Sequence, residues 1–149
     1  MRTFIVVSFC DYFDCTHVWG CLHDSCDNRS MNYDEESDTL YVSFAPGEAA
    51  TGIELNQHIL LRIKKQERRA TGLTLFDYSV LAQQTDIGPR SFSLTGLAEL
   101  SPELRALVIE ILRAEPVRTI LALSVDWPSP LEIIPITSLQ PIAMFKSAA

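Results

Sequence analysis

Four carboxylates around one turn could bind a hard metal ion. They lie between two extended stretches, at Asp34, Glu35, Glu36 and Asp38. Calcium and magnesium prefer several oxygen ligands around one point, so the turn is a candidate cation site with Asp34 and Asp38 as ligands. The regular calcium-loop pattern, with its central glycine and distal glutamate, is absent. We favour a solvated turn in which the aspartates cap backbone amides.

The cysteines could bind zinc. All four precede residue 31, at Cys10, Cys15, Cys21 and Cys26. Thiolates are zinc ligands, and four of them complete a tetrahedron. Their gaps of four, five and four residues are looser than the tight pairs typical of structural zinc sites. The thiols are therefore metal candidates only if residues 1–30 belong to the native protein.

Two other interpretations apply to residues 1–30. A secretory signal would begin at Arg2, but its apolar run is short and no A-x-A-like cleavage site follows. Alternatively, the segment is disordered or lies upstream of the natural start. We favour this last interpretation, with Met31 as the initiator, because the apolar periodicity of strands begins directly after it.

Nucleophilic catalysis has one candidate set after Met31, which is His58 with Ser79 or Asp77. No G-x-S-x-G elbow accompanies these residues, and a histidine on the polar side of a strand is usually solvated. General acid–base catalysis needs a carboxylate whose pKa is displaced by burial or a like charge, and the sequence indicates none. We therefore predict no catalytic residue and no cofactor.

One basic cluster could contact phosphates, at Lys64, Lys65, Arg68 and Arg69. On a hairpin tip these cations would face a nucleic-acid backbone, with Phe76 or Tyr78 available to stack on a base. Glu67 dilutes the positive field, and such a composition is equally typical of a solvent-exposed turn. The net charge of −7 opposes binding to a phosphate backbone, so nucleic acid is not the favoured partner.

The composition is that of a globular protein. The chain has 149 residues, of which 47% are hydrophobic and 21% charged, and this length forms a core without a metal or disulfide. No apolar run approaches the ~20 residues that cross a bilayer. The negative charge favours encounter with a basic protein. We expect a cytoplasmic protein with no membrane segment.

Alternating apolar residues predict several strands. Residues 38–44 place Leu40, Val42 and Phe44 on one face, and further extended stretches follow at 53–55, 59–64 and 71–76. Short polar turns between them predict a small antiparallel β-meander. Asp77 begins a brief helix through Gln83, and residues 85–96 are expected to be a loop.

The C-terminal half predicts a helix and two more strands. Ser101-Pro102-Glu103 combines an N-cap, a first-turn proline and a favourable charge, so we expect a helix over about 102–114. Strands are expected at 117–125, as a central strand, and at 131–136, as an edge strand because of Pro135. The fold class is α+β, with a β-meander domain at 31–84 and an α/β extension at 85–149 on the same core.

One motif resembles a known family. Residues 33–42 read Tyr-Asp-Glu-Glu-Ser-Asp-Thr-Leu-Tyr-Val. This resembles the opening Tyr-Asp-x-x-x-Asp-x-Leu-Tyr-(Ile/Val) of small bacterial proteins catalogued as "domain of unknown function 2283". Residues 72–75 with Ser79 resemble the family's ending more weakly. The similarity covers about 31–80, and members commonly start just before the motif, which supports Met31. The matching motif residues are Tyr33, Asp34, Asp38, Leu40, Tyr41 and Gly72.

The resemblance implies a small sheet with a short helix but no reaction, because no activity is established for the family as a whole. Some members are thought to sit beside toxin-like genes, which implies an antitoxin-like role. This chain departs from the family in carrying the cations of 64–69 where members have acids, and Thr74 where they often have Glu. A carboxylate site across those strands would therefore lack partners here.

We interpret the chain as a non-enzymatic protein-interaction module. A sheet edge or exposed face would bind a basic or toxin-like protein, or a second copy of the chain as a homo-oligomer. The alternatives are a small metal-dependent enzyme built on the acidic turn, and nucleic-acid contact through residues 64–69.

Overall fold

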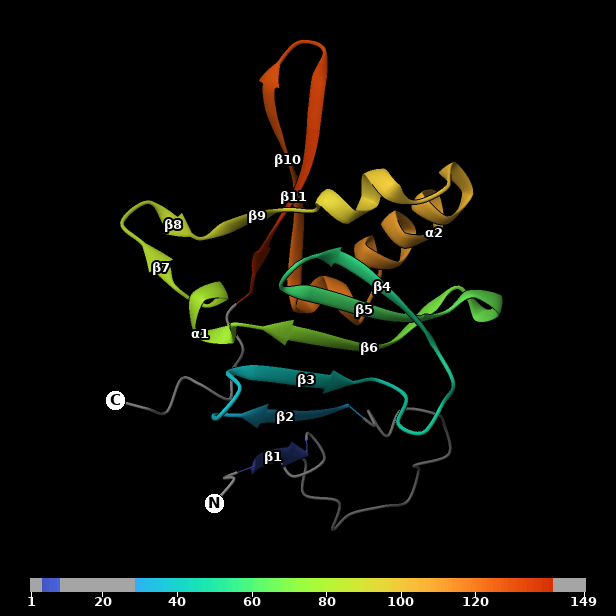
Figure 1. Ribbon diagram of the computed structural model, residues 1–149, viewed down its shortest axis with the longest axis vertical. Coiled ribbons are helices and arrows are strands. Elements are labelled where there is room, and N and C mark those ends of the chain that lie inside the picture. Colours follow the sequence, from blue (N-terminus) through green and yellow to red (C-terminus); the bar gives the residue numbers. More distant parts are fainter. Residues whose placement is uncertain (1–3, 9–28, 141–149) are drawn as a thin grey trace, which may run out of the picture.

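The computed structural model describes residues 4–8 and 29–140 (Figure 1). Its larger sheet is antiparallel, with strands in the order β1-β2-β3-β6-β5-β4. β4, β5 and β6 are consecutive neighbours, but β3 pairs with β6, so the chain after β3 crosses to the far edge of the sheet (Figure 1). The strands are β1 Phe4–Ser8, β2 Ser30–Asp34, β3 Thr39–Ser43, β4 Thr51–Asn56, β5 Ile59–Lys64 and β6 Arg69–Phe76.

The N-terminal predictions are only partly covered by the described residues. Phe4–Ser8, inside the segment expected to be disordered, forms β1 and pairs with β2. The four cysteines lie outside the described residues, so the zinc, signal and initiator interpretations stay predictions.

The predicted alternation explains which face of the sheet is buried. Leu40 and Val42 of β3 lie next to Leu75 and Leu73 of β6 in the register, and all four side chains are buried. Since side chains alternate across a strand, Tyr41 and Thr74 lie on the opposite face. The α+β prediction is confirmed, including the brief helix α1 (Tyr78–Leu81) after β6.

A second sheet follows, in the order β10-β11-β9. The expected loop at 85–96 instead contains the small β7–β8 hairpin and β9, because β9 finds a partner in β11, far along the chain. The bounds are β7 Gln84–Thr85, β8 Gly88–Pro89, β9 Ser91–Ser93, β10 Leu121–Ser129 and β11 Glu132–Leu139.

Two positional predictions in this sheet are wrong. The strand expected at 117–125 begins with the 3-10 helix η4 (Val117–Thr119), and β10 is an edge strand rather than a central one. β11, expected at an edge, is central. Pro135 has no N–H to donate, but it lies just beyond the residues that pair with β9, and its carbonyl accepts the Leu94 N–H at 2.9 Å.

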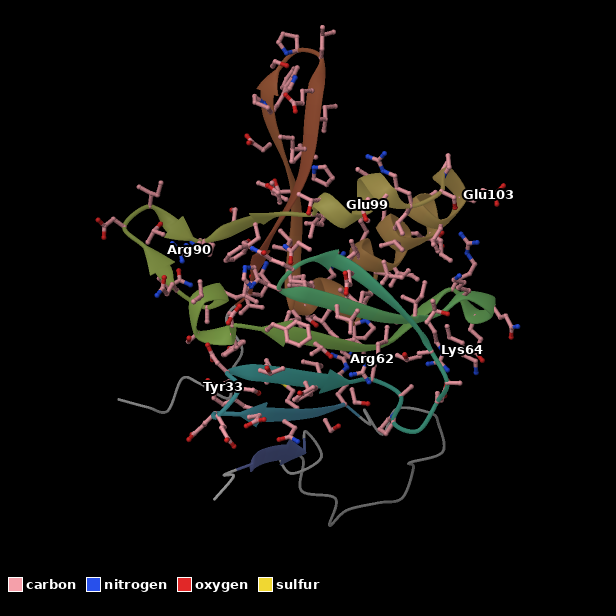
Figure 2. All side chains as sticks on the ribbon, viewed as in Figure 1. Tyr33, Arg62, Lys64, Arg90, Glu99 and Glu103 are labelled. Carbon is pink, nitrogen blue, oxygen red and sulfur yellow. The ribbon has the colours of Figure 1, made fainter. Side chains whose placement is uncertain are left out.

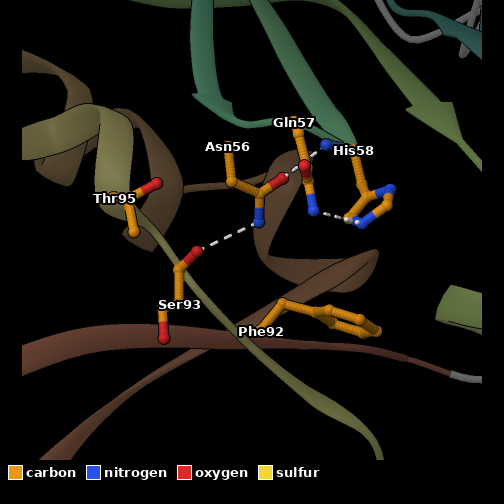
Figure 3. A pocket seen from close by; sticks show the side chains of 6 residues that line it. All are labelled: Asn56, Gln57, His58, Phe92, Ser93 and Thr95. Carbon is orange, nitrogen blue, oxygen red and sulfur yellow. Dashed lines mark hydrogen bonds between the residues drawn. The ribbon is translucent and has the colours of Figure 1, made fainter.

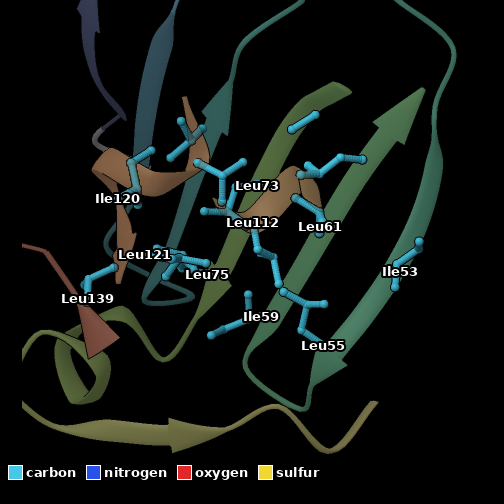
Figure 4. Close-up of a cluster of buried hydrophobic side chains, with 14 of the residues drawn as sticks. Ile53, Leu55, Ile59, Leu61, Leu73, Leu75, Leu112, Ile120, Leu121 and Leu139 are labelled. Atoms are coloured by element: carbon cyan, nitrogen blue, oxygen red, sulfur yellow. The ribbon is translucent and has the colours of Figure 1, made fainter. Parts of the chain in front are cut away.

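The predicted helix is confirmed as α2 (Pro102–Arg113). Ser101 caps it, since its Oγ accepts the Leu104 N–H at 3.3 Å. α2, η4 and the base of the β10–β11 hairpin pack their apolar side chains on the buried face of the larger sheet (Figure 4). Buried residues from before and after residue 84 thus form one core, while the domain boundary itself stays a prediction. Labelled members in Figure 4 are Ile53, Leu55, Ile59, Leu61, Leu73, Leu75, Leu112, Ile120, Leu121 and Leu139.

The short helix η3 (Thr95–Glu99) seals the edge at β4. A Cβ placed on Gly96 would lie 1.9 Å from the Glu54 carbonyl oxygen, so only glycine permits this approach. Within 29–140, no helix is both long and apolar enough to cross a membrane.

Candidate functional site

The residues of the N-terminal motif meet in a hydrogen-bonded cluster, which we call the motif corner: Tyr33, Asp38 and Ser79. Tyr33 Oη donates to Asp38 Oδ1 at 2.6 Å, and Ser79 Oγ donates to Asp38 Oδ2 at 2.5 Å. The Ser79 N–H also points at both carboxylate oxygens, 3.1 and 3.2 Å away. The carboxylate therefore ties the β2–β3 turn to α1.

Backbone geometry explains the position of Asp38. Its φ of +51° lies in the left-handed region, which aspartate enters more readily than most residues. This conformation ends the turn and presents the Asp38 carbonyl to the Tyr78 N–H at 2.9 Å. The rings of Tyr33 and Tyr78 meet edge to face, with centroids 5.6 Å apart.

The hydrogen bonds set the protonation states at the motif corner. Partial burial of Asp38 opposes its ionisation, but the hydrogen bonds from Ser79 and Tyr33 outweigh burial and lower the pKa of the Asp38 carboxyl. The bond to Asp38 is also the main reason that the pKa of Tyr33 is raised to about 12, with burial second. Burial alone raises the pKa of Tyr78 to about 12. Asp38 is thus ionised and both phenols are protonated near neutral pH.

Asp34 supports the same turn rather than standing beside Asp38 in a ligand set. It accepts the Glu36 N–H at 3.1 Å and the Ser37 hydroxyl at 2.9 Å. Within the described ranges, no group of three or more His, Cys, Asp or Glu side chains is arranged to hold a metal ion. The two predicted metal candidates therefore act, in this geometry, as acceptors for backbone and hydroxyl groups.

The other motif residues have packing roles. Leu40 is fully buried in the core, whereas Tyr41 is partly exposed on the opposite face. At Gly72 a Cβ would lie 3.0 Å from the Val42 carbonyl oxygen, so glycine allows β6 to lie close to β3. Thr74 accepts a hydrogen bond from Arg62 Nη2 at 3.0 Å.

The candidate nucleophilic set is not assembled. His58 Nδ1 lies 2.9 Å from Asp77 Oδ2, but the Ser79 hydroxyl is directed to Asp38 instead. His58 borders an open hollow of about 420 Å³ (Figure 3), in which the Gln57 amide nitrogen lies 3.2 Å from His58 Nε2. The lining residues are Asn56, Gln57, His58, Phe92, Ser93 and Thr95. The last three come from the segment expected to be a loop, so no sequence signal placed them beside His58.

The predicted basic cluster is largely neutralised by ion pairs. Lys64, at the end of β5 (Figure 2), lies 3.3 Å from Glu48 and 2.6 Å from Glu67. Arg69 pairs with the same two glutamates at 2.5 Å. Arg68 pairs with Glu110 of α2, which lowers the pKa of that carboxyl. Only Lys65 of the four cations has no ion pair in the described part of the chain.

Comparison with known proteins bears on the motif corner. Residues 30–79 match the family described as "Protein of unknown function (DUF2283)". The match confirms the resemblance and spans about a third of the chain. No curated protein and no solved structure matches.

The DUF2283 segment ends at α1, and the most exposed apolar surface lies beyond it. The outer half of the β10–β11 hairpin extends beyond β9 and projects away from the larger sheet, with no other described element beside it (Figures 1 and 2). We call residues 124–135 the arm. Four large apolar side chains on it are 61–99% exposed: Val125, Trp127, Leu131 and Ile133.

The sequence predicted strands at 117–125 and 131–136 with residues 126–130 outside both strands, and for this reason it missed the arm. Instead, β10 continues to Ser129 and passes through a register shift between Asp126 and Ser129. The apolar alternation at 121, 123, 125 and 127 was the available signal. It predicts a strand, but not whether anything lies opposite its apolar face.

Proposed function

We propose that this protein is a non-enzymatic protein-interaction module, and the exposed arm is the observation that carries this proposal. Trp127 and Ile133 are 69% and 67% exposed. Contiguous exposed apolar patches are uncommon on monomeric proteins and mark interaction sites, and tryptophan is among the residues enriched at binding hot spots.

The shape of the arm supports the same proposal. β9 pairs with Ile136, Thr137 and Ser138 of β11, so among the residues that the structure describes no third strand pairs with the hairpin beyond Ile136. An isolated two-stranded ribbon is marginally stable in water. A partner on its apolar face would remove that surface from water and stabilise the arm.

The bonding of polar groups elsewhere favours this function over the alternatives. An enzyme built on the acidic turn would need Asp38 to leave Tyr33 and Ser79, which occupy its oxygens. Nucleic-acid contact through 64–69 would have to break pairs with Glu48, Glu67 and Glu110, since those carboxylates face the cations.

The net charge indicates which class of other proteins is the more suitable partner. With a charge of −7, the chain associates faster with a basic protein than with an acidic one. An antitoxin-like role toward a basic toxin-like protein is the more specific form of the proposal, and the family resemblance supports it.

The test is affinity capture of the tagged chain from lysate of the source cells, comparing the wild type with Trp127→Glu/Ile133→Glu. Ile87→Glu is the matched control, because Ile87 is 99% exposed on the β7–β8 turn, away from the arm. We expect one or more proteins, identified by mass, to co-elute with the wild type and the control but not with the arm variant. Equal recovery from all three forms would contradict the proposal.

A further inference from the structure

We propose that the arm's apolar face docks against the same face of a second copy of this chain, forming a twofold-symmetric dimer. The inference rests on the proposed function and names the occupant of the arm. Five observations carry it: the composition of the face, the placement of charge, the projection of the arm, the blocked strand edge and the exposed area.

The face is a continuation of the protein's own core. The register pairs Leu121 with Leu139, Leu123 with Thr137 and Val125 with Pro135, so these side chains share one face of the ribbon. Leu121, Thr137 and Leu139 are buried at the base. By alternation along β11, Ile133 lies on the same face further out, and Trp127 follows two residues after Val125, within the register shift, where nothing among the described residues covers either side chain.

Charge is placed on the reverse of the arm. Asp126 pairs with Ile134 and precedes Trp127, so it lies on the opposite face, and Glu132 precedes Ile133 in the same way. These are the arm's only charged residues. A partner recognised through its positive charge would find no carboxylate on the apolar face, whereas an identical uncharged face is complementary to it.

The projection of the arm also limits repulsion between two acidic chains. Each copy carries a net charge of −7. Contact through the arms holds the bodies apart, and at physiological salt the interaction between exposed charges is screened beyond about 8 Å. Self-association through any flat face of the body would bring those charges closer.

The edge of β10 is a poor site for strand addition. Pro128 has no N–H to donate, and the register shift between Asp126 and Ser129 bends the ribbon there. Contact between faces, as in two packed sheets, is therefore favoured over pairing of edges.

The area suits a weak, reversible dimer. From typical side-chain areas, the exposed apolar arm residues hold roughly 400 Å² per copy, or about 800 Å² in a symmetric pair. The tip residues Pro128 and Pro130 add to this surface. The total lies below the roughly 1,000 Å² typical of a stable specific interface, so association should be weak and should depend on protein concentration in the micromolar range or above.

Sedimentation equilibrium of the purified full chain tests the dimer. At about 100 μM we expect the wild type to approach twice the monomer mass and to dissociate on dilution. Trp127→Glu and the milder Ile133→Thr should weaken dimerisation at least about tenfold, and Ile87→Glu should leave it unchanged. Far-UV circular dichroism checks that each variant is folded.

Trp127 fluorescence gives a second readout in a Trp19→Phe chain, where it is the sole tryptophan. Its emission should shift to the blue as concentration rises. A monomer at every concentration overturns the inference, and so does a dimer that survives both arm substitutions. A monomer whose Trp127 emission is already blue-shifted would mean that another part of this chain covers the arm, which also overturns it.

The two proposals fail separately. If the purified chain stays monomeric while lysate capture depends on the arm, the partner is a different protein and the interaction function stands. If the dimer forms and no other protein is captured, the module binds only itself.

Discussion

The base of the β10–β11 hairpin packs into the core, whereas its outer half is among the most exposed parts of the molecule. Leu121 is 2% exposed, and Val125, on the same face of the same strand, is 61% exposed. Their side chains are both apolar and their backbones are both extended. The difference lies in what faces them, since the core and the larger sheet cover the base and no described element covers the arm.

The motif corner differs from the arm because its interactions are already satisfied inside the molecule. Its polar groups all find partners within the chain, as Tyr33 and Ser79 satisfy Asp38. A surface whose hydrogen bonds are complete has little to offer a ligand, while an uncovered apolar face gains from any complementary one. Four predictions test this contrast between the packed, hydrogen-bonded body of the protein and the uncovered arm.

The largest loss of stability is expected at Gly96, where η3 approaches the backbone of β4 most closely. Gly96→Ala would place a methyl group 1.9 Å from the Glu54 carbonyl oxygen, and relief requires η3 to move off β4. We expect a loss of about 3 kcal/mol or more in the free energy of unfolding. Urea denaturation measures it. Gly52→Ala is the control, because its Cβ would meet only Leu60 Cδ1 at 3.5 Å, and equal losses in both variants would contradict the close packing.

The next effect compares two residues on one face of β10. Leu121→Ala opens a cavity in the core and should cost about 2–5 kcal/mol. Val125→Ala should change the free energy of unfolding by less than about 0.5 kcal/mol in the monomer, since little surrounds the side chain. Both are measured by urea denaturation at low protein concentration. A large loss for Val125→Ala under those conditions would mean that the arm is covered within one chain.

Asp38→Asn tests the motif corner through pH. The lowered pKa of Asp38 means that its charge stabilises the fold above its unfolded value near 3.8, and that this contribution is lost as pH falls through the folded pKa. We expect the substitution to cost about 1–2 kcal/mol at pH 7 and progressively less as the pH falls below 3.8 and through the folded pKa. Thermal unfolding across pH measures it, with the exposed arm variant Asp126→Asn as control. A gap that stays constant with pH would contradict the role of the ionised carboxylate.

The smallest effect is expected at the pair of Arg68 and Glu110. Both side chains are more than half exposed, so their attraction is screened by water and salt. Arg68→Ala should lower the melting temperature slightly at low ionic strength and not at all at high salt. A loss that persists in high salt would show that the β5–β6 turn depends on α2 more than the geometry indicates.

Local chemistry explains which elements were predictable. Ser101 and Pro102 define the start of α2 by capping, and Leu40 and Val42 identify the buried face of β3 by alternation. Asp34 was correctly expected to cap a backbone amide within its turn. These features depend on neighbours a few residues apart, which any single sequence displays.

Long-range pairing explains what could not be predicted. Ser91–Ser93 forms a strand only because β11, more than forty residues later, lies beside it. The ion pairs of Arg68 with Glu110 and of Lys64 with Glu48 likewise join distant segments. The sequence alone therefore does not show that these cations are paired.

The sequence by itself determined the periodicity of the strands, the limits of α2 and the turn chemistry of Asp34, because each follows from local sterics and hydrogen bonding. The tertiary structure alone decided that Val117–Thr119 is helical, that β10 is an edge and that Val125 and Trp127 are uncovered. Burial depends on which surfaces lie opposite one another. The sequence of a strand does not specify which other surface, if any, will cover it.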